Sequence, residues 1–257
     1  MIKRYVIFII LSIFLLVGLC NGQYRISNQE LNSNLRDVPS FLQPQHNALG
    51  DRMDDANKAL TIYSGRLVDA NGNEAPARVT YQLPNLVRLE GFKDRDAVLS
   101  FDGERANGIS SRENDEPLIE LFVMDFAEGM FSSVQESAAV RLIGTGFGPD
   151  PQSNKNTDGP RYDIYEIAAP PKGLEDKTVR IKKYYFDSGT KLLLSTRYND
   201  HSVSPAKRIE TRFSNWERIE GSAYPTKVER YENGKRIFAF IVEIIESGVS
   251  LDKEFFQ

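Results

Sequence analysis

The stretch from Arg180 to Ile245 contains five runs of strand-forming residues separated by short turns. The first two runs, Arg180–Asp187 and Lys191–Tyr198, flank Ser-Gly-Thr, a pattern typical of a β-hairpin. Asn, Gly and Pro residues separate the later runs, as at Asn233-Gly234. Because strands joined by short turns pair antiparallel, this stretch predicts a five-stranded meander that the rest of the chain must cover.

The last run of the meander is apolar on both of its faces. One face is expected to carry Ile237, Ala239, Ile241 and Ile245, and the other Phe238, Phe240, Val242 and Ile244. A strand with one face in water alternates apolar and polar residues, so apolar groups are expected to cover both sides here. Either the strand is central, between a helix and a second layer, or the sheet curls around an apolar cavity. Periodicity does not separate these arrangements.

Strand patterns also fill the first half of the chain. Runs at 61–69 and 75–83 flank Asn71-Gly72, which is a strong hairpin signal. Further runs follow at 86–92 and 97–101. Together with the meander and two helical patterns, they predict an α+β fold, with one large antiparallel sheet and its helices on one side.

The two helical patterns differ in character. Residues 47–63 place Leu49 and Met53 on a single apolar face. The segment Pro117–Phe131 is apolar around most of its circumference, which is typical of a buried helix. It is either a fixed part of the core or a movable lid over the concave side of the sheet, and the pattern leaves both open.

Residues 1–22 have the pattern of a secretory leader, in which a basic start precedes an apolar run and a few small residues. Removal of this leader would leave a polar, flexible spacer at 23–44 and one domain at 45–257. The alternative is a lipoprotein leader, in which Cys20 becomes a lipid-anchored N-terminus. We therefore expect an exported, periplasmic protein that is either free or anchored through Cys20.

Composition excludes several classes of protein. Cys20 is the single cysteine, so a chain cleaved after the leader has no disulfide, thiol nucleophile or cysteine-based zinc site. The full chain has a formal net charge of −4, and its leader removes positive charge only. No basic patch stands out, so nucleic-acid binding is not expected.

The chain offers little for catalysis. His46 and His201 are its only histidines, and neither is near a nucleophile motif such as Gly-x-Ser-x-Gly. No cluster has metal-ligand spacing, and pairs such as Asp94 and Asp96 are typical of solvent-facing turns. The chain is therefore expected to be non-enzymatic, with no catalytic residue, metal or cofactor. A hydrolase is the weakest alternative, because a sequence does not reveal carboxyl groups that converge in a cleft.

The order of several short motifs resembles that of the bacterial lipoprotein-sorting carriers (LolA-like). The motifs begin at Tyr63 (Tyr-Ser-Gly), Asn71 (Asn-Gly), Leu83 (Leu-Pro-Asn-Leu-Val-Arg), Leu99 (Leu-Ser-Phe-Asp-Gly), Tyr185 (Tyr-Phe-Asp-Ser-Gly), Gly221 (Gly-Ser-Ala-Tyr-Pro) and Asn233 (Asn-Gly). Each motif alone is ordinary strand-and-turn chemistry, and the specificity lies in their order. The resemblance spans nearly all of the chain that follows the leader.

This resemblance implies a strongly curved, incomplete β-barrel of about 11 strands, with helices closing its concave face. It further implies a monomeric carrier that binds acyl chains or lipoproteins in an apolar cavity and meets membrane-bound donor and acceptor proteins. The alternative is a structural, interaction or envelope-stress-sensing module of the same fold with a filled core.

Two departures from the carriers favour an apolar-ligand cavity over genuine lipoprotein sorting. The carriers have an arginine before the Pro-Asn pair, where this chain has Leu83, and the chain has an additional loop at 150–159. Strand and helix phase place the following residues in the cavity and lid: Leu83, Phe101, Leu118, Phe122, Phe126, Phe238, Phe240 and Ile241.

Overall fold

The structure is a computed structural model and describes residues 39–53, 60–83, 86–92, 98–104, 106–108, 115–135, 139–147, 161–169, 180–201, 204–248 and 251–257. The predicted leader, most of the predicted spacer and the loop at 150–159 lie outside these ranges.

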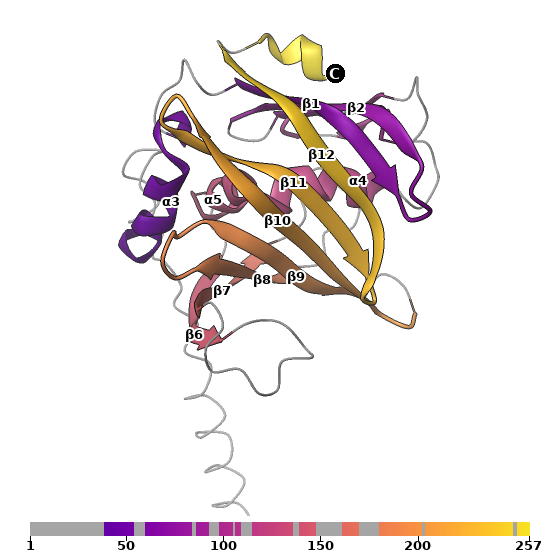
Figure 1. The fold of residues 1–257 in the computed structure, drawn as a ribbon. Coiled ribbons are helices and arrows are strands. Elements are labelled where there is room, and N and C mark those ends of the chain that lie inside the picture. The colour runs from indigo at the N-terminus through magenta and orange to yellow at the C-terminus, as the bar shows by residue number, and fades with distance from the viewer. Residues whose placement is uncertain are drawn as a thin grey trace, which may run out of the picture.

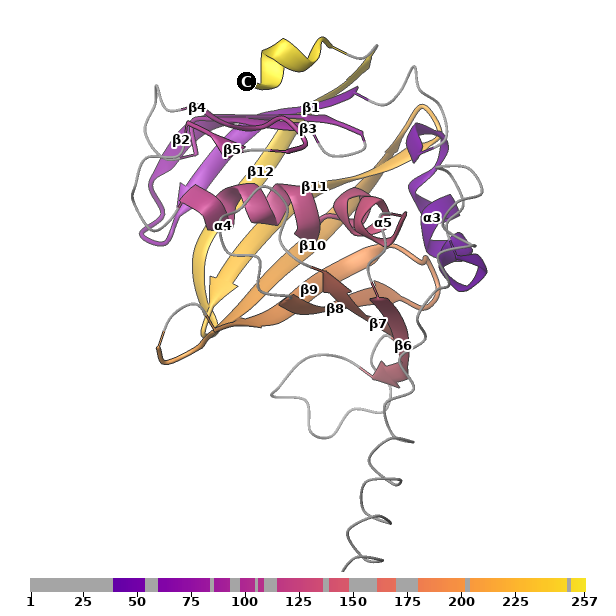
Figure 2. The same cartoon turned by 180° about the vertical axis from the view of Figure 1, so that it is seen from behind.

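Twelve strands form one antiparallel sheet, in the order β5-β4-β3-β2-β1-β12-β11-β10-β9-β8-β7-β6 (Figures 1 and 2). The strands are β1 (Leu60–Asp69), β2 (Glu74–Gln82), β3 (Leu86–Glu90), β4 (Val98–Phe101), β5 (Ala106–Asn107), β6 (Ala139–Phe147), β7 (Arg161–Ala169), β8 (Arg180–Asp187), β9 (Leu193–Asp200), β10 (Lys207–Ile219), β11 (Ser222–Glu232) and β12 (Lys235–Gly248). The five-stranded meander predicted from the sequence is β8 to β12, and it is confirmed.

The two halves of the sheet join where the first and last strands pair. Residue Leu60 of β1 lies opposite Gly248 of β12, and Asp69 lies opposite Phe238. The chain's last strand is thus central in the sheet. The sheet order begins at β5 and ends at β6 without closing, so the predicted incomplete barrel is confirmed.

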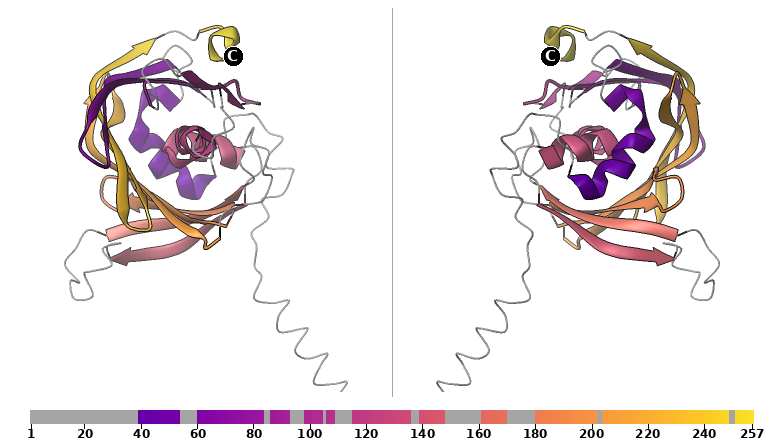
Figure 3. Two further views of the ribbon diagram at one scale, coloured as in Figure 1. Left: turned by 90° about the vertical axis from the view of Figure 1, so that its right-hand side faces the viewer. Right: turned by 90° about the vertical axis from the view of Figure 1, so that its left-hand side faces the viewer.

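The sheet is strongly curved, with one concave and one convex face (Figure 3). A register shift between Ser64 and Gly65 lies at the β1–β12 junction, and such bulges bend a strand and increase its twist. A side chain at Gly65 would place its Cβ 2.0 Å from the carbonyl oxygen of Ile241. Only glycine lets the two backbones approach this closely.

The predicted helix at 47–63 is wrong in its bounds. The structure has a 3₁₀ turn η1 (Ser40–Leu42), helix α3 (Gln43–Leu49) and a second 3₁₀ turn η2 (Asp51–Met53). Helix α3 ends at Gly50, whose φ of 81° is left-handed, and the β-favouring residues from Leu60 onward belong to β1. The helix also begins within the segment predicted as spacer, where Leu42 is fully buried.

The predicted helix at 117–131 is present, in three pieces: α4 (Asp115–Glu120), a π-helical turn η4 (Leu121–Asp125) and α5 (Ala127–Gln135). We call these three elements together the inner helical segment. Phe126 breaks the segment with an extended backbone, at φ −66° and ψ 152°. Figure 3 shows the curved sheet wrapping around α4 and α5. None of the helices within the described residues has the length and hydropathy needed to span a membrane.

The inner helical segment is buried on every side from Ile119 to Phe131. This confirms the burial expected from its nearly all-round apolar pattern. Its side chains share one hydrophobic core with those of the concave face, including Val79, Val87, Leu193 and Phe213. The concave side of the sheet is therefore occupied by the protein's own chain.

The convex face of β12 does not have the apolar cover expected from the sequence. Ile241 is partly exposed and Ile244 is 58 % exposed, beside an ion pair between Arg66 and Glu243. Ile244 pairs with Ser64, and Val242 pairs with Gly65, so Glu243 is an extra residue on β12. This bulge reverses the phase and turns Ile244 outward, whereas the sequence placed it beside Phe238 and Phe240.

A short C-terminal 3₁₀ turn, η5 (Lys253–Phe256), lies on the outer side of the sheet, near β2 and β3 (Figure 1). Phe256 is fully buried there. Arg88 of β3 donates a hydrogen bond of 3.0 Å to the carbonyl oxygen of Phe255, and Gln82 of β2 exchanges two hydrogen bonds with the Leu251 backbone. The apolar cover of the convex face is thus local.

Gly129 of α5 offers a test of how tightly the inner helical segment is folded on itself. A Cβ at Gly129 would lie 1.9 Å from the carbonyl oxygen of Val123 in η4. In a solvent-exposed helix, a Gly→Ala substitution stabilises the folded state by about 1 kcal/mol through helix propensity. Here we expect Gly129→Ala to lower the free energy of unfolding instead, by about 1–3 kcal/mol, because the backbone must shift. Urea denaturation measures the change.

The matched control is Gly146→Ala in β6, where the new Cβ has no neighbour closer than the Ile164 Cδ1 at 3.7 Å. This substitution should leave the denaturation midpoint close to that of the unmodified protein. Equal stability of the two variants would show that α5 does not pack on η4 this closely.

Candidate functional site

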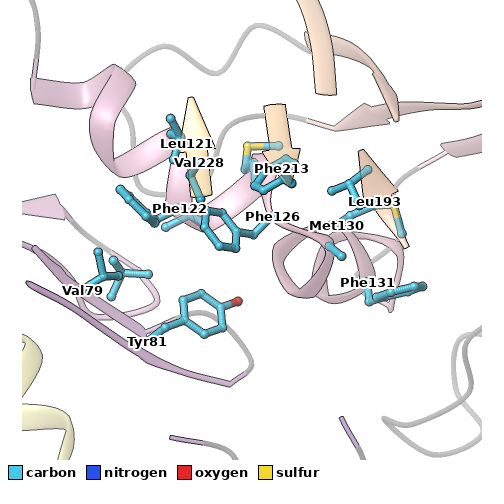
Figure 4. Packing of buried hydrophobic residues seen from close by; sticks show 14 of the residues in the cluster. Val79, Tyr81, Leu121, Phe122, Phe126, Met130, Phe131, Leu193, Phe213 and Val228 are labelled. Atoms are coloured by element: carbon cyan, nitrogen blue, oxygen red, sulfur yellow. The ribbon is translucent and has the colours of Figure 1, made fainter. Parts of the chain in front are cut away.

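Five of the predicted cavity residues meet in one buried cluster: Phe101, Phe122, Phe126, Phe238 and Phe240. Phe122 and Phe126 come from the inner helical segment and the others from the sheet. The Phe122 and Phe126 ring centroids are 5.2 Å apart, and the Phe126 ring lies 5.0 Å from that of Phe213 (Figure 4). The interface between the sheet and the inner helical segment is therefore aromatic.

Phe92, which the sequence reasoning did not select, joins the two sides of this cluster. Its ring centroid lies 5.3 Å from that of Phe122 and 5.3 Å from that of Phe240. The contact with Phe122 is edge-to-face and that with Phe240 is tilted, and aromatic contacts of this kind add to the stabilisation from burial.

The other three predicted residues lie elsewhere. Leu83 and Leu118 are partly buried and pack at the margin of the cluster. Ile241 lies on the convex face, opposite Arg66 and Lys227, and takes no part in the core. The sequence could not distinguish the faces of β12 because both are apolar.

Buried ion pairs around Lys182 also connect the inner helical segment to the sheet. The Lys182 Nζ lies 2.8 Å from the Glu120 Oε1 and 2.5 Å from the Asp125 Oδ1, and all three side chains are at most 1 % exposed. Arg180 binds the second oxygen of Glu120. Arg230 lies 3.7 Å from the Asp125 Oδ2. Two carboxylates of the segment thus face three cations of the sheet.

Hydroxyl groups of the sheet complete the contacts with η4. The Thr211 Oγ1 donates a hydrogen bond of 2.8 Å to the Asp125 Oδ2, and the Thr196 Oγ1 donates one of 2.9 Å to the Asp125 carbonyl oxygen. The Tyr184 hydroxyl donates one of 2.7 Å to the Met124 carbonyl oxygen. The π-helical turn ends at the extended Phe126, so its last carbonyl oxygens lack helical donors, and these side chains supply donors for two of them.

A second buried ion pair holds α5. The Arg52 Nη2 lies 2.7 Å from the Glu128 Oε1, with both side chains at most 4 % exposed. Arg52 also donates a hydrogen bond of 3.0 Å to the Tyr63 hydroxyl, and its Cζ lies 4.3 Å from the centroid of the Tyr224 ring. The inner helical segment is therefore held by ion pairs on both sides of the break at Phe126, as well as by aromatic packing.

The charges of these pairs are mutually stabilised. Burial opposes the charged form of Lys182, but Asp125 and Glu120 outweigh this effect and raise the pKa of its ammonium above the ordinary value. Burial likewise opposes the charge of Arg52, and Glu128 raises the pKa of the guanidinium. Both cations stay protonated in the interior.

Two solved structures superpose on most of this chain. A LolA superfamily protein from Nitrosomonas europaea superposes with a TM-score of 0.52 and 10 % identity, over 85 % of this chain and 96 % of that protein. A domain assigned to outer membrane lipoprotein sorting, from Vibrio parahaemolyticus, superposes with a TM-score of 0.53 and 8 % identity, over 84 % of this chain and 94 % of that domain. The chain has a LolA-like fold. Neither a protein-family model nor a curated protein sequence matches it.

The LolA-like fold was expected from motif order, but the buried ion pairs of the inner helical segment were not. We call the group formed by Lys182, Glu120 and Asp125 the ionic anchor. The missed signal is strand phase: Lys182 shares its face of β8 with the buried Tyr184 and Phe186. Likewise, Glu120 and Asp125 lie within an almost wholly apolar helical run. A charge in phase with a core face predicts a buried partner.

Within the described residues of this LolA-like domain, no group of His, Cys, Asp or Glu side chains is arranged to hold a metal ion. His46 is buried in α3, with its ring 5.2 Å from that of Phe131, and His201 is exposed after β9. Asp94 and Asp96 lie outside the described residues.

Tyr198 of β9 gives the ionic anchor a measurable response to pH. Burial raises the pKa of Tyr198 to about 12, although Arg230 and Lys182 nearby lower it. An unfolded tyrosine loses its proton near pH 10, so between pH 10 and 12 the unfolded state holds fewer protons than the folded one. The free energy of unfolding should then fall by about 1.4 kcal/mol per pH unit because of this residue. Urea denaturation between pH 9 and 12 measures the slope.

The variant Tyr198→Phe should show a shallower fall with pH, by about one proton. Below pH 10 its stability relative to the unmodified protein should not depend on pH. An unchanged slope would mean that Tyr198 is solvated in solution.

Proposed function

We propose that this protein is a non-enzymatic carrier of the cell envelope, which binds an acyl chain between the curved sheet and the inner helical segment. The observation that carries the proposal is the aromatic interface at that place, where Phe122 and Phe126 face Phe92, Phe213 and Phe240. The LolA-like fold supports it. An acyl chain needs only apolar walls, and each buried methylene contributes about 0.8 kcal/mol.

The described state is closed, because the inner helical segment occupies the place where the ligand would lie. Binding then requires that this segment move away from the sheet. The break at Phe126 divides it into two helical halves that need not move together. Leu118 and Phe122 belong to one half of the lid, and Leu83 and Phe101 belong to the sheet side.

The proposal includes export to the periplasm, free or anchored through Cys20, and a monomer that meets donor and acceptor proteins at membranes. Residues 1–22 would be a cleaved leader in the free form, and the domain would be the part from about residue 45 onward.

One specific observation favours a different function. The inner helical segment is completely buried and held by ion pairs, as expected of a structural or interaction module with a filled core. In that case the segment never leaves the sheet and no lipid binds.

A chain-length series separates the two functions. Delipidated protein is titrated with saturated fatty acids of increasing length, and binding is followed by displacement of a fluorescent fatty acid. A carrier should bind about fourfold more tightly for each added methylene, until the cavity is full. Native mass spectrometry of the protein as purified should also show a bound lipid. Absence of probe uptake, with a bare protein mass, would refute the carrier and support the filled-core module.

A further inference from the structure

The inner helical segment presents only acceptors to one part of the sheet, and that part presents only donors to the segment. The acceptors are Glu120, Asp125 and the carbonyl oxygens of Met124 and Asp125. The donors are Arg180, Lys182, Tyr184, Thr196, Thr211 and Arg230. We call these six residues the donor floor.

The donor floor carries three positive charges and no acidic side chain of its own. Lys182 and Arg230 are at most 4 % exposed, and Arg180 is 12 % exposed. Their compensating carboxylates, Glu120 and Asp125, both come from the inner helical segment. If the segment moves aside, as the proposed function requires, Lys182 loses both of its carboxylates and Arg230 loses Asp125, while both remain in the concave face. Arg180 loses Glu120 but keeps the charge of Asp200 on β9 nearby.

The identity of the incoming molecule then follows from charge. A neutral lipid would leave the buried Lys182 without either of its carboxylates, which is strongly unfavourable in a low-dielectric interior. A molecule with an anionic oxygen head would replace the lost carboxylates at the same donors. Its chain would replace the side chains of Phe122 and Phe126 in the aromatic cluster.

We propose that the ligand is an anionic amphiphile, with a carboxylate or phosphate head on the donor floor and an acyl chain against the aromatic cluster, and that the inner helical segment imitates it in the closed state. This inference rests on the proposed function and narrows its ligand class. Arg52 is not part of the donor floor, because it pairs with Glu128 of α5, on the other side of the break at Phe126.

A matched pair of probes tests the head group. 1-Pyrenedodecanoic acid and its methyl ester share a chain and a fluorophore and differ only in charge. At pH 8 the acid should bind at least tenfold more tightly than the ester. Acetate and inorganic phosphate, which have no chain, should not displace the acid at millimolar concentration.

The variant Glu120→Gln tests the imitation itself. It removes one carboxylate of the inner helical segment and leaves Lys182 and Arg180 in place, so a ligand meets less competition. Glu120 acts only in the closed state, so the variant should open more easily and bind the acid several-fold more tightly than the unmodified protein. The ester should gain by the same factor, so the preference for the acid over the ester should be unchanged. The control Glu217→Gln, at an exposed position of β10, should alter neither affinity. A gain of affinity does not arise from misfolding.

The outcomes separate the two proposals. If acid and ester bind equally and Glu120→Gln changes neither, the anionic-ligand inference is overturned and the carrier stands. If neither probe binds, the carrier itself fails. If inorganic phosphate displaces the acid as well as a second fatty acid does, the donor floor is a site for free anions and the amphiphile is overturned.

Discussion

Replacing Lys182 by methionine should lower the free energy of unfolding by about 3–5 kcal/mol. The substitution keeps a side chain of similar length but removes the cation shared by Glu120 and Asp125. Arg180 still pairs with Glu120, but the cation that remains for Asp125 is the more distant Arg230, 3.7 Å away, beside the hydrogen bond from Thr211. A carboxylate without a close cation in the interior is strongly destabilising. Urea denaturation at pH 7, with an unchanged dependence on urea concentration, measures the loss.

The control is Lys183→Met, one residue further along β8, where the side chain is exposed on the opposite face. It should change stability by less than about 0.5 kcal/mol. The double variant Lys182→Met with Asp125→Asn should regain part of the loss, because it removes the uncompensated charge as well as the cation. If Lys182→Met is as stable as Lys183→Met, the ion pairs do not hold the inner helical segment in solution.

The strands of the fold were predictable because their signals are local. The turn between β8 and β9 depends on Asp187, whose Oδ1 accepts hydrogen bonds from the backbone of Gly189 and Thr190. Such turn chemistry is visible within a few residues of sequence. The strands on either side show their period directly, so the meander follows from the sequence.

The pairing of β1 with β12 was not predictable in this way. It joins residues at opposite ends of the domain, such as Leu60 and Gly248, and no local pattern specifies it. The incomplete barrel was anticipated only through the resemblance to the lipoprotein-sorting carriers. The bulge at Glu243 was also invisible, so Ile244 was assigned to the wrong face.

The candidate site was predictable in its apolar part and not in its charged part. The apolar run of the inner helical segment indicates Phe126 as a core residue, and the apolar character of β12 makes Phe240 a candidate without deciding its face. Strand phase could have marked Lys182 as buried, but not its partners, because Glu120 and Asp125 come from a different element. Tertiary contacts alone bring these charges together.

Replacing Phe126 by alanine removes a ring through which the inner helical segment contacts the sheet. The ring is 5 % exposed and lies against Phe122, Phe213 and Tyr63, with centroid distances of 5.2, 5.0 and 6.4 Å. Its loss should lower the free energy of unfolding by about 3–5 kcal/mol. For a domain of this size, the thermal midpoint should fall by roughly 10 °C. The 38 % exposed Phe255 provides the control, and Phe255→Ala should lower the midpoint far less.

Hydrogen exchange of the backbone amides decides whether the inner helical segment is a fixed part of the core or a lid. A lid opens without unfolding the sheet, so in the unmodified protein the amides at 119–131 should exchange faster than those of β12. Phe126→Ala should then lower the free energy of lid opening and the free energy of global unfolding by the same amount. The ring contacts are absent both when the lid is open and when the domain is unfolded. If both sets of amides exchange at one rate in the unmodified protein, the inner helical segment separates only when the whole domain unfolds. The acyl-chain carrier would then lack the opening on which it depends, and the filled-core module would account for the structure.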